Sequence, residues 1–182
     1  MLVKLRSPSS APVVKLNFDT SVPPVDTPVQ AVGLGSIDRN GKYYPDDLLK
    51  VTVDVWNQAE CSNSYRQLYG MPIPSTAMCA GDDRGQKDSC FGDSGGPLLD
   101  DSGTIQYGIT SFGAEQCADA DYPGVYTRVS SFAGWIQTTV CSLSENGPEE
   151  WCGPDNKEGG SLCPSRSLSL FDNLSKGGQS DC

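Results

Sequence analysis

Apolar and polar positions alternate most regularly over residues 48–56, where polar residues separate Val51, Val53 and Val55. A period of two residues is typical of a half-buried β-strand. Shorter runs of similar character, separated by glycine-rich and polar loops, extend the prediction to six strands, over residues 29–35, 48–56, 77–80, 96–99, 105–112 and 124–129. Short antiparallel strands joined by glycine-rich loops favour a closed barrel, because closure removes the edges and buries one face of each strand. We therefore predict an all-β fold.

Two segments carry helix signals. Asn57 can cap a short helix that runs towards Tyr69 and stops at Gly70. Ser130 or Ser131 can cap a last helix that ends near residue 140. Its apolar residues recur at three- and four-residue spacing, which would seat one face of the helix on the barrel. These residues are Phe132, Trp135, Ile136 and Val140.

The flanking segments differ from this central region. Met1–Leu5 is a short apolar run that predicts a strand, and prolines at positions 12, 23, 24 and 28 make residues 7–28 an extended connector. Residues 141–182 are rich in Gly, Ser, Pro, Asn and Asp, hold four cysteines and show no periodicity. They form either a small module stapled by two disulfides, with three pairings open, or a largely disordered tail. The predicted segments are residues 1–28, 29–140 and 141–182.

Composition narrows the functional classes. The 182 residues, 37% of them hydrophobic, suffice for one domain with a sizeable core, and no apolar run approaches membrane-spanning length. A net charge of −10 argues against nucleic acid as a partner, because phosphate binding needs clustered Lys and Arg. Eight cysteines, spread singly rather than as Cys-x-x-Cys pairs, indicate disulfides rather than zinc or redox chemistry. We expect a secreted, extracellular protein without cofactor or metal. The N-glycosylation sequon Asn173-Leu174-Ser175 is consistent with secretion.

The chemistry centres on Gly92-Asp93-Ser94-Gly95-Gly96-Pro97. Glycines let the main chain adopt dihedral angles that a Cβ forbids and leave amide N–H groups open to a visiting group. A hydroxyl among such amides suits acyl transfer, in which Ser94 would attack a carbonyl and the Gly92 and Ser94 amides would hold the oxyanion. The alternative for a lone Gly-x-Ser-Gly is a glycine-rich turn with an exposed serine.

The residues around this segment carry a resemblance. Residues 88–97, Asp-Ser-Cys-Phe-Gly-Asp-Ser-Gly-Gly-Pro, resemble the active-site segment of trypsin-like serine proteases. Ser111-Phe112-Gly113, Cys117 and residues 123–129, Pro-Gly-Val-Tyr-Thr-Arg-Val, follow in the order and at the spacing of that family. The resemblance is to the carboxy-terminal half of the trypsin/chymotrypsin-like family, peptidase family S1. It implies that the six strands form the second barrel of a two-barrel fold, with residues 7–28 as the connector between the barrels.

The resemblance also implies a specificity for basic residues. Asp88 matches the acid at the floor of the trypsin-type pocket, where a carboxylate selects Arg or Lys. Gly113 and Gly124 match wall positions that a larger residue would close, and Tyr126 is expected to line the pocket. The segment that pairs with the extended substrate backbone is Ser111, Phe112 and Gly113. The implied partner is a polypeptide cleaved after Arg or Lys. The alternative interpretation, without the resemblance, is that Asp88 is an exposed acidic residue in a polar surface loop.

Other implied features concern Asp93 and the cysteines. Asp93 resembles the family's activation acid, which forms an ion pair with the new amino terminus of the cleaved zymogen. Without that partner we expect the loop to loosen or the carboxylate to turn to water, because a buried unpaired carboxylate is costly. Cys61 with Cys79, and Cys90 with Cys117, match two disulfides of the family. A third family bridge is absent at both ends, and we expect Ala31 and Asp100 at the matching positions.

The chain contains no histidine. Histidine is the general base of this family because its pKa lies near neutrality, so we expect the chain alone to be nearly inert. The resemblance also implies a triad aspartate, and secretion implies a signal peptide; neither is recognisable in this sequence, and we expect a truncated chain that lacks its N-terminal barrel. Two functions follow: a trypsin-like endopeptidase represented by its carboxy-terminal barrel, or a non-catalytic secreted protein that grips basic segments. The intact nucleophile segment favours the first.

Overall fold

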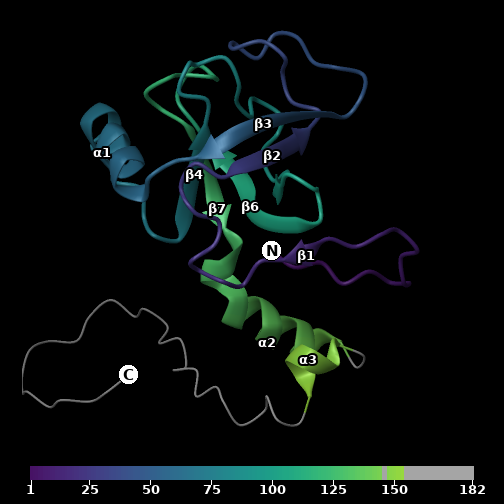
Figure 1. Cartoon of the computed structure of the whole chain (residues 1–182). Helices are drawn as coiled ribbons and strands as arrows, with labels where there is room; N and C mark the ends of the chain where they lie inside the picture. Colours follow the sequence, from purple (N-terminus) through teal and green to yellow (C-terminus); the bar gives the residue numbers. More distant parts are fainter. Residues whose placement is uncertain (145–146, 154–182) are drawn as a thin grey trace, which may run out of the picture. The chain divides into compact units, whose positions relative to one another are not determined.

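Six antiparallel strands close into a barrel within the part of the chain that the computed structural model describes, residues 1–144 and 147–153 (Figure 1). Around the barrel the order is β6-β5-β2-β3-β4-β7, and pairing of β7 with β6 closes it. The strands are β2 (Pro28–Gly33), β3 (Leu49–Val55), β4 (Ala77–Gly81), β5 (Pro97–Asp100), β6 (Ile105–Phe112) and β7 (Gly124–Arg128). The predicted closed antiparallel barrel is confirmed.

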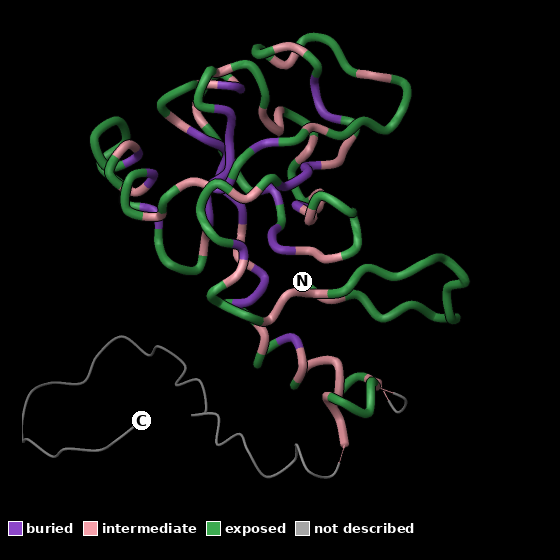
Figure 2. The backbone as a smooth tube through the Cα atoms, viewed as in Figure 1, coloured by how far each residue is buried: buried purple, intermediate pink, exposed green. Residues whose placement is uncertain are grey.

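The core of the barrel follows from the alternation seen in the sequence. In β3, Val53 and Val55 are buried and Thr52 and Asp54 are exposed. Figure 2 shows buried positions concentrated on the barrel strands. Inward-facing residues of several strands make up one core cluster, which includes Val29, Val53, Met78, Leu98 and Tyr126. Burial of each such side chain contributes about 1.5–3 kcal/mol to stability.

The structure of residues 1–28 differs from the predicted strand and extended connector. Within the predicted connector, Lys15–Leu16 forms β1, which pairs in parallel with β6. The strand expected over Met1–Leu5 is wrong, since these residues are not in a strand and Met1, Val3 and Leu5 are exposed. An apolar run becomes a strand only where a neighbouring strand satisfies its backbone, and no described strand pairs with it.

Helix α1 (Gln58–Tyr69) has the predicted ends. The Asn57 side-chain oxygen accepts hydrogen bonds from the amides of Ala59 and Glu60, at 2.8 and 3.3 Å. Gly70 ends the helix in the left-handed conformation, with φ +70°. On the buried face, Cys61 and Tyr65 join a second core cluster with Ile73, Cys79 and Val125.

The last helix starts later than predicted. Residues Val129–Phe132 form a 3-10 turn, and helix α2 follows at Ala133–Leu143. Ser130 and Ser131 therefore lie inside the turn, where Ser130 is buried and caps nothing. The tighter turn closes on backbone hydrogen bonds and needs no side-chain cap.

The chain divides into two compact units between residues 136 and 137. The first contains residues 3–136, and the second begins at residue 137. The second contains a disulfide between Cys141 and Cys152 and the short helix α3 (Glu149–Cys152), which fixes one of the pairings that the sequence left open. Cys163, Cys182 and the sequon at Asn173 lie outside the described residues. In the described part of the chain no helix is both long and apolar enough to cross a membrane.

The pairing of β2 with β5 corrects the expected positions of the absent third disulfide, which were Ala31 and Asp100. Asp100 of β5 lies opposite Val29, and Ala31 lies opposite Leu98. The position facing Asp100 is thus Val29, not Ala31. Asp100 instead accepts hydrogen bonds from the amides of Thr104 and Ile105, both at 2.6 Å, and so shapes the turn between β5 and β6.

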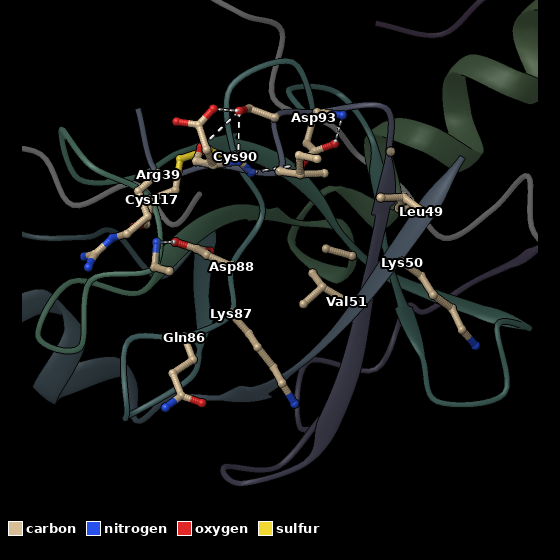
Figure 3. Close-up of a pocket in the computed structure, with 17 residues that line it drawn as sticks. Arg39, Leu49, Lys50, Val51, Gln86, Lys87, Asp88, Cys90, Asp93 and Cys117 are labelled. Atoms are coloured by element: carbon tan, nitrogen blue, oxygen red, sulfur yellow. Dashed lines mark hydrogen bonds between the residues drawn. A yellow bond between two sulfur atoms is a disulfide. The ribbon is translucent and has the colours of Figure 1, made fainter. Parts of the chain in front are cut away.

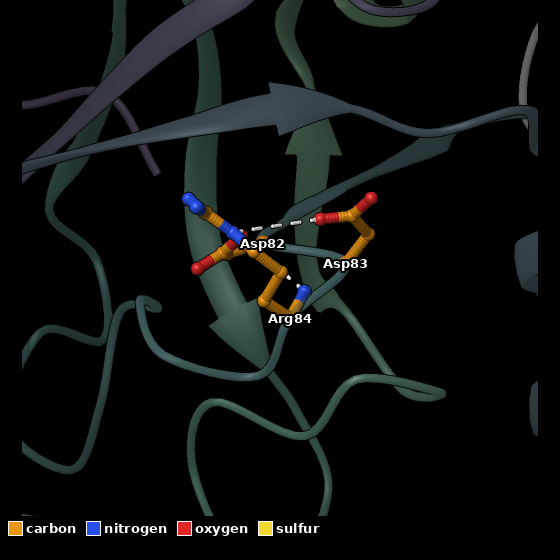
Figure 4. A network of polar contacts seen from close by, with 3 residues as sticks. All are labelled: Asp82, Asp83 and Arg84. Atoms are coloured by element: carbon orange, nitrogen blue, oxygen red, sulfur yellow. Dashed lines mark hydrogen bonds and ion pairs between the residues drawn. The ribbon is translucent and has the colours of Figure 1, made fainter.

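The loop after β4 leads towards Asp88. Figure 4 shows Arg84 between the carboxylates of Asp82 and Asp83. The Arg84 Nε lies 3.2 Å from Asp82 Oδ1 and 3.9 Å from Asp83 Oδ1. Burial acts to raise the pKa of Asp82, but the hydrogen bonds and charge of Arg84 outweigh it and hold that pKa below its usual range. The loop therefore has an internal ion pair.

Candidate active site

Ser94 lies exposed in a turn whose backbone is fixed on both sides. The Gly95 amide donates to the Thr110 carbonyl of β6 at 2.9 Å, and the Gly96 amide donates to the Asp93 carbonyl at 2.8 Å. A Cβ on Gly96 would fall 2.8 Å from that carbonyl oxygen, so a side chain does not fit. Gly92 and Gly95 have φ values of +98° and +85°, a region that favours glycine. The glycines of this segment are therefore needed to present the Ser94 hydroxyl.

The two amides expected to hold an oxyanion are open. Among the described residues, the N–H groups of Gly92 and Ser94 donate no hydrogen bond. Both belong to the turn that carries the Ser94 hydroxyl. Unpaired donors beside a nucleophile can stabilise the negative charge that develops on an attacked carbonyl oxygen.

A cavity of about 280 Å³ joins Ser94 to most of the predicted pocket residues. Its walls come from the segment before the nucleophile, from the end of β6 and from the start of β7. The predicted residues that line it are Asp88, Ser94, Ser111, Phe112, Gly113 and Gly124. A Cβ on Gly113 would meet no atom within 4 Å, so residue 113 borders open space. One continuous cavity thus connects a nucleophile with a carboxylate.

Asp88 is held at one oxygen and unpaired at the other. Oδ2 accepts a hydrogen bond from the Ala118 amide at 3.0 Å, whereas Oδ1 is buried without a partner among the described atoms. A Cβ on Gly124 would fall 2.7 Å from this Oδ1, so the glycine keeps the space beside it free. Desolvation raises the pKa of Asp88 to about 6, although the amides of Ala118 and Ser89 act to lower it. An unpaired buried carboxylate in a cavity suits a cationic ligand.

Tyr126 lies behind the pocket wall and does not line the cavity. Its side chain is fully buried, and its hydroxyl lies 2.9 Å from the Ser89 hydroxyl. The Tyr126 hydroxyl would also lie 3.1 Å from a Cβ on Gly124. The alternation of β7 turns Tyr126 into the barrel core, so it supports the wall from behind.

Asp93 is better satisfied than expected. Its Oδ1 accepts a hydrogen bond from the Gly35 amide and its Oδ2 accepts one from the Cys90 amide, both at 2.8 Å. It borders a second cavity, of about 260 Å³, which Asp88 also lines (Figure 3). The Asp93 carboxylate therefore has one backbone donor at each oxygen and is not left without a partner.

Two disulfides of the barrel join the pairs that the resemblance implies, Cys61–Cys79 and Cys90–Cys117. The first ties α1 to β4, and the second links the segment before the nucleophile to the loop after β6. Cys90 and Cys117 both line the cavity beside Ser94. A disulfide of this kind contributes about 2–4 kcal/mol, chiefly by restricting the unfolded chain.

Sequence reasoning missed an apolar groove of about 750 Å³ beside the pocket. It shares Phe112 and Gly113 with the pocket and extends over the end of α1 and the loop that follows. Further lining residues are Tyr65, Tyr69, Met71, Ile73 and Phe91. The only signal in the sequence was an apolar loop after a helix, and periodicity does not place such a loop in space.

The closed barrel thus carries a serine turn with two open amides, beside a cavity that Asp88 also lines. The chain that carries these features is similar in sequence to known proteins. Residues 1–136 match the sequence model of the family described as Trypsin. The chain belongs to the trypsin family. One relative, the venom plasminogen activator LV-PA of Lachesis muta muta, is 37% identical over 147 residues, which cover 80% of this chain and 55% of the relative.

Kallikrein-1 of Mus musculus is 38% identical, over 77% of this chain and 52% of the relative. The solved structure of neuropsin, a serine protease expressed in the limbic system of mouse brain, has a TM-score of 0.61 and 32% identity. That match covers 69% of this trypsin-family chain and 52% of neuropsin. The chain thus spans about half the length of the relatives it matches.

Proposed function

We propose that this chain supplies the nucleophile, the oxyanion amides and the specificity pocket of an extracellular serine endopeptidase that cleaves polypeptides after Arg or Lys. The observation that carries the proposal is the cavity that holds both Ser94 and the half-paired carboxylate of Asp88. A carboxylate at the end of a slot selects a long cationic side chain, because such a side chain reaches the carboxylate and replaces its lost hydration.

The reaction assigned to this site is acyl transfer. The Ser94 Oγ attacks the substrate carbonyl carbon, and the amides of Gly92 and Ser94 donate hydrogen bonds to the oxygen that becomes negative. The Ser94 proton must pass to a general base, which then protonates the leaving amine. Ser111–Gly113 lies at the end of β6 beside the cavity, where an extended substrate backbone can pair with it.

The base is not supplied by this chain. None of its 182 residues is histidine, and loss of the base in a related mechanism lowers turnover by about 10⁶. We therefore assign the base and its orienting acid to an N-terminal barrel outside this sequence. The relatives, of which the matches cover about half, support this assignment.

The absence of histidine also favours a second function, a secreted protease-like barrel that grips basic segments without cleaving them. Both functions use the same pocket and differ in whether a base joins it. The coding sequence upstream of Met1 separates them. An in-frame segment with an Ala-Ala-His-Cys-like stretch and an aspartate supports the protease, and an in-frame stop supports the binding protein.

The activity of the chain itself is tested with an arginine amide substrate and with p-aminobenzamidine, an aromatic amidinium that is fluorescent in apolar sites. We expect no hydrolysis above that of the Ser94→Ala variant, together with binding of the amidinium. Asp88→Asn is the matched variant, since it keeps the shape of the side chain and removes its charge; we expect its affinity to fall about tenfold or more.

Hydrolysis that Ser94→Ala abolishes would refute inactivity of the chain alone. A folded chain that does not bind the amidinium, or an Asp88→Asn variant that binds it equally well, would refute the basic specificity. Folding is checked separately by the circular dichroism of each variant, so loss of binding is not mistaken for loss of structure.

A further inference from the structure

The loop that follows β2 is folded around one carboxylate. Asp38 Oδ2 accepts hydrogen bonds from the amides of Lys42 and Tyr43, both at 2.7 Å, and Oδ1 accepts one from Asn40 at 2.9 Å. The Ser36 hydroxyl lies 3.0 Å from Oδ2. These hydrogen bonds hold the pKa of Asp38 below its usual range against a desolvation that acts to raise it. Residues 36–43, here called the Asp38 loop, thus have a defined backbone.

The Asp38 loop reaches the pocket through Arg39. The Arg39 Nε donates to the Cys117 carbonyl at 2.8 Å, and the Cys117 amide donates to the Arg39 carbonyl at 3.2 Å. Figure 3 shows Arg39 beside Cys117, and Cys117 is disulfide-bonded to Cys90. Among the described residues Arg39 forms no salt bridge. Its polar contacts with Cys117 are one hydrogen bond from the side-chain Nε and one to its backbone carbonyl.

The same loop also contacts the segment before the nucleophile. The Ser36 amide donates to the Phe91 carbonyl at 2.8 Å, and the Cys90 sulfur lies 3.4 Å from the Asp38 carbonyl. Cys90, Phe91 and Cys117 all line the cavity that contains Ser94 and Asp88. One surface loop therefore joins both ends of the Cys90–Cys117 disulfide.

We propose that Arg39 is a positioning residue of the specificity pocket: its two hydrogen bonds with Cys117 hold the Cys117 wall in place, and the Asp38 carboxylate fixes the loop that carries Arg39. This proposal rests on the proposed function of the pocket. Arg39 does not line the cavity that contains Ser94. It acts through Cys117 and through the adjacent Ala118, whose amide donates to Asp88 Oδ2.

The direction in which ligand affinity changes on replacement of Arg39 distinguishes a positioning role from an effect of its charge. A cation near a cation-binding pocket repels the ligand, so its removal strengthens binding if Arg39 acts only through charge. If Arg39 positions the wall, its removal weakens binding. Arg39→Met keeps most of the aliphatic stem and removes the donor and the charge. Lys42→Met removes a charge from the same loop, and the Lys42 side chain makes no hydrogen bond or ion pair among the described residues.

The test measures p-aminobenzamidine affinity of the full chain and of both variants, with urea unfolding of each. We expect Arg39→Met to bind about three- to tenfold more weakly at nearly unchanged stability, and Lys42→Met to bind equally or slightly more tightly. Equal or tighter binding by Arg39→Met would overturn the proposal.

A second measurement does not depend on the ligand. Arg39→Met keeps the Arg39 carbonyl, to which the Cys117 amide donates, but removes the Nε donor that holds the Cys117 backbone against it. We therefore expect hydrogen exchange at the Cys117 amide to accelerate in Arg39→Met and not in Lys42→Met. Unchanged exchange at Cys117 would overturn the positioning role even if the pocket itself failed to bind cations. Failure of the parent chain to bind, with accelerated exchange in Arg39→Met, would refute the proposed pocket and support the structural link.

Discussion

The Asp93 carboxylate lies directly against the backbone of Gly35. The Gly35 amide donates to Asp93 Oδ1 at 2.8 Å, and a Cβ on Gly35 would fall 2.3 Å from the Asp93 carboxyl carbon. Gly33 is equally close, with its Cβ position 2.0 Å from Oδ1. The two glycines therefore form the space that Asp93 occupies, and they lie about 60 residues away in the sequence.

We expect Gly35→Ala to lower the free energy of unfolding by about 1–3 kcal/mol, because the new methyl group must displace the Asp93 carboxylate or the loop. Urea denaturation measures the change. Gly134→Ala is the control, since a Cβ there meets no atom within 4 Å and alanine favours the helix. In an Asp93→Ala background the cost of Gly35→Ala should largely disappear, and an undiminished cost would contradict the assignment to Asp93.

The barrel was predictable because its determinants are local. The alternation of Val51, Val53 and Val55 and the cap at Asn57 act within a few residues. By contrast, no local pattern indicates that Gly35 accommodates Asp93 or that Arg39 pairs with Cys117, because these contacts depend on how distant loops pack. The run Met1–Leu5 shows the converse, since its residues favour a strand and the described structure offers it no partner.

The candidate site residues came from the resemblance, because local patterns do not indicate which loop residues meet in space. The acid, the wall glycines and the serine were brought to one cavity as expected. Tyr126 was expected to line the pocket. The alternation of β7 instead turns its side chain into the barrel core. The groove beside the pocket was missed because its residues come from α1, from the loop after it and from β6.

Asp88 makes the stability of the chain depend on pH. Its pKa is raised by burial from an unfolded value near 4 to about 6, so the folded state binds more protons between these values. The stabilisation is complete below about pH 4 and is lost as pH rises through about 6. We expect the parent chain to lose about 3 kcal/mol relative to Asp88→Asn across this interval. Urea titrations of both proteins at several pH values measure it, and parallel pH profiles would contradict it.

The same carboxylate should make ligand binding depend on pH with the opposite sign. An amidinium requires the ionised form of Asp88, and this form decreases tenfold for each pH unit below about 6. We expect p-aminobenzamidine affinity to rise with pH up to about 7 and then to level off. Fluorescence titrations between pH 4.5 and 8 measure this. A neutral aromatic amide provides the control, and a shared profile for both ligands would assign the dependence to a conformational change instead.

Tyr65 links α1 to the wall of the pocket. Its hydroxyl donates to the buried Pro123 carbonyl at 2.8 Å, and its ring makes edge contacts with Phe112 and Tyr122. We expect Tyr65→Phe to lower the free energy of unfolding by about 1–2 kcal/mol, because that carbonyl then stays buried without a donor. Tyr69→Phe is the control, since the Tyr69 side chain is exposed and its hydroxyl makes no hydrogen bond among the described residues.

The hydrogen bond of Tyr65 should also influence ligand binding, because Pro123 directly precedes the wall residue Gly124. We expect Tyr65→Phe to weaken p-aminobenzamidine binding about two- to fivefold, measured where both proteins are fully folded. If stability falls and affinity does not, Tyr65 stabilises the barrel without shaping the pocket. Since the ring contacts with Phe112 and Tyr122 are retained in phenylalanine, a loss of affinity is attributed to the hydroxyl and to the backbone that it holds at Pro123.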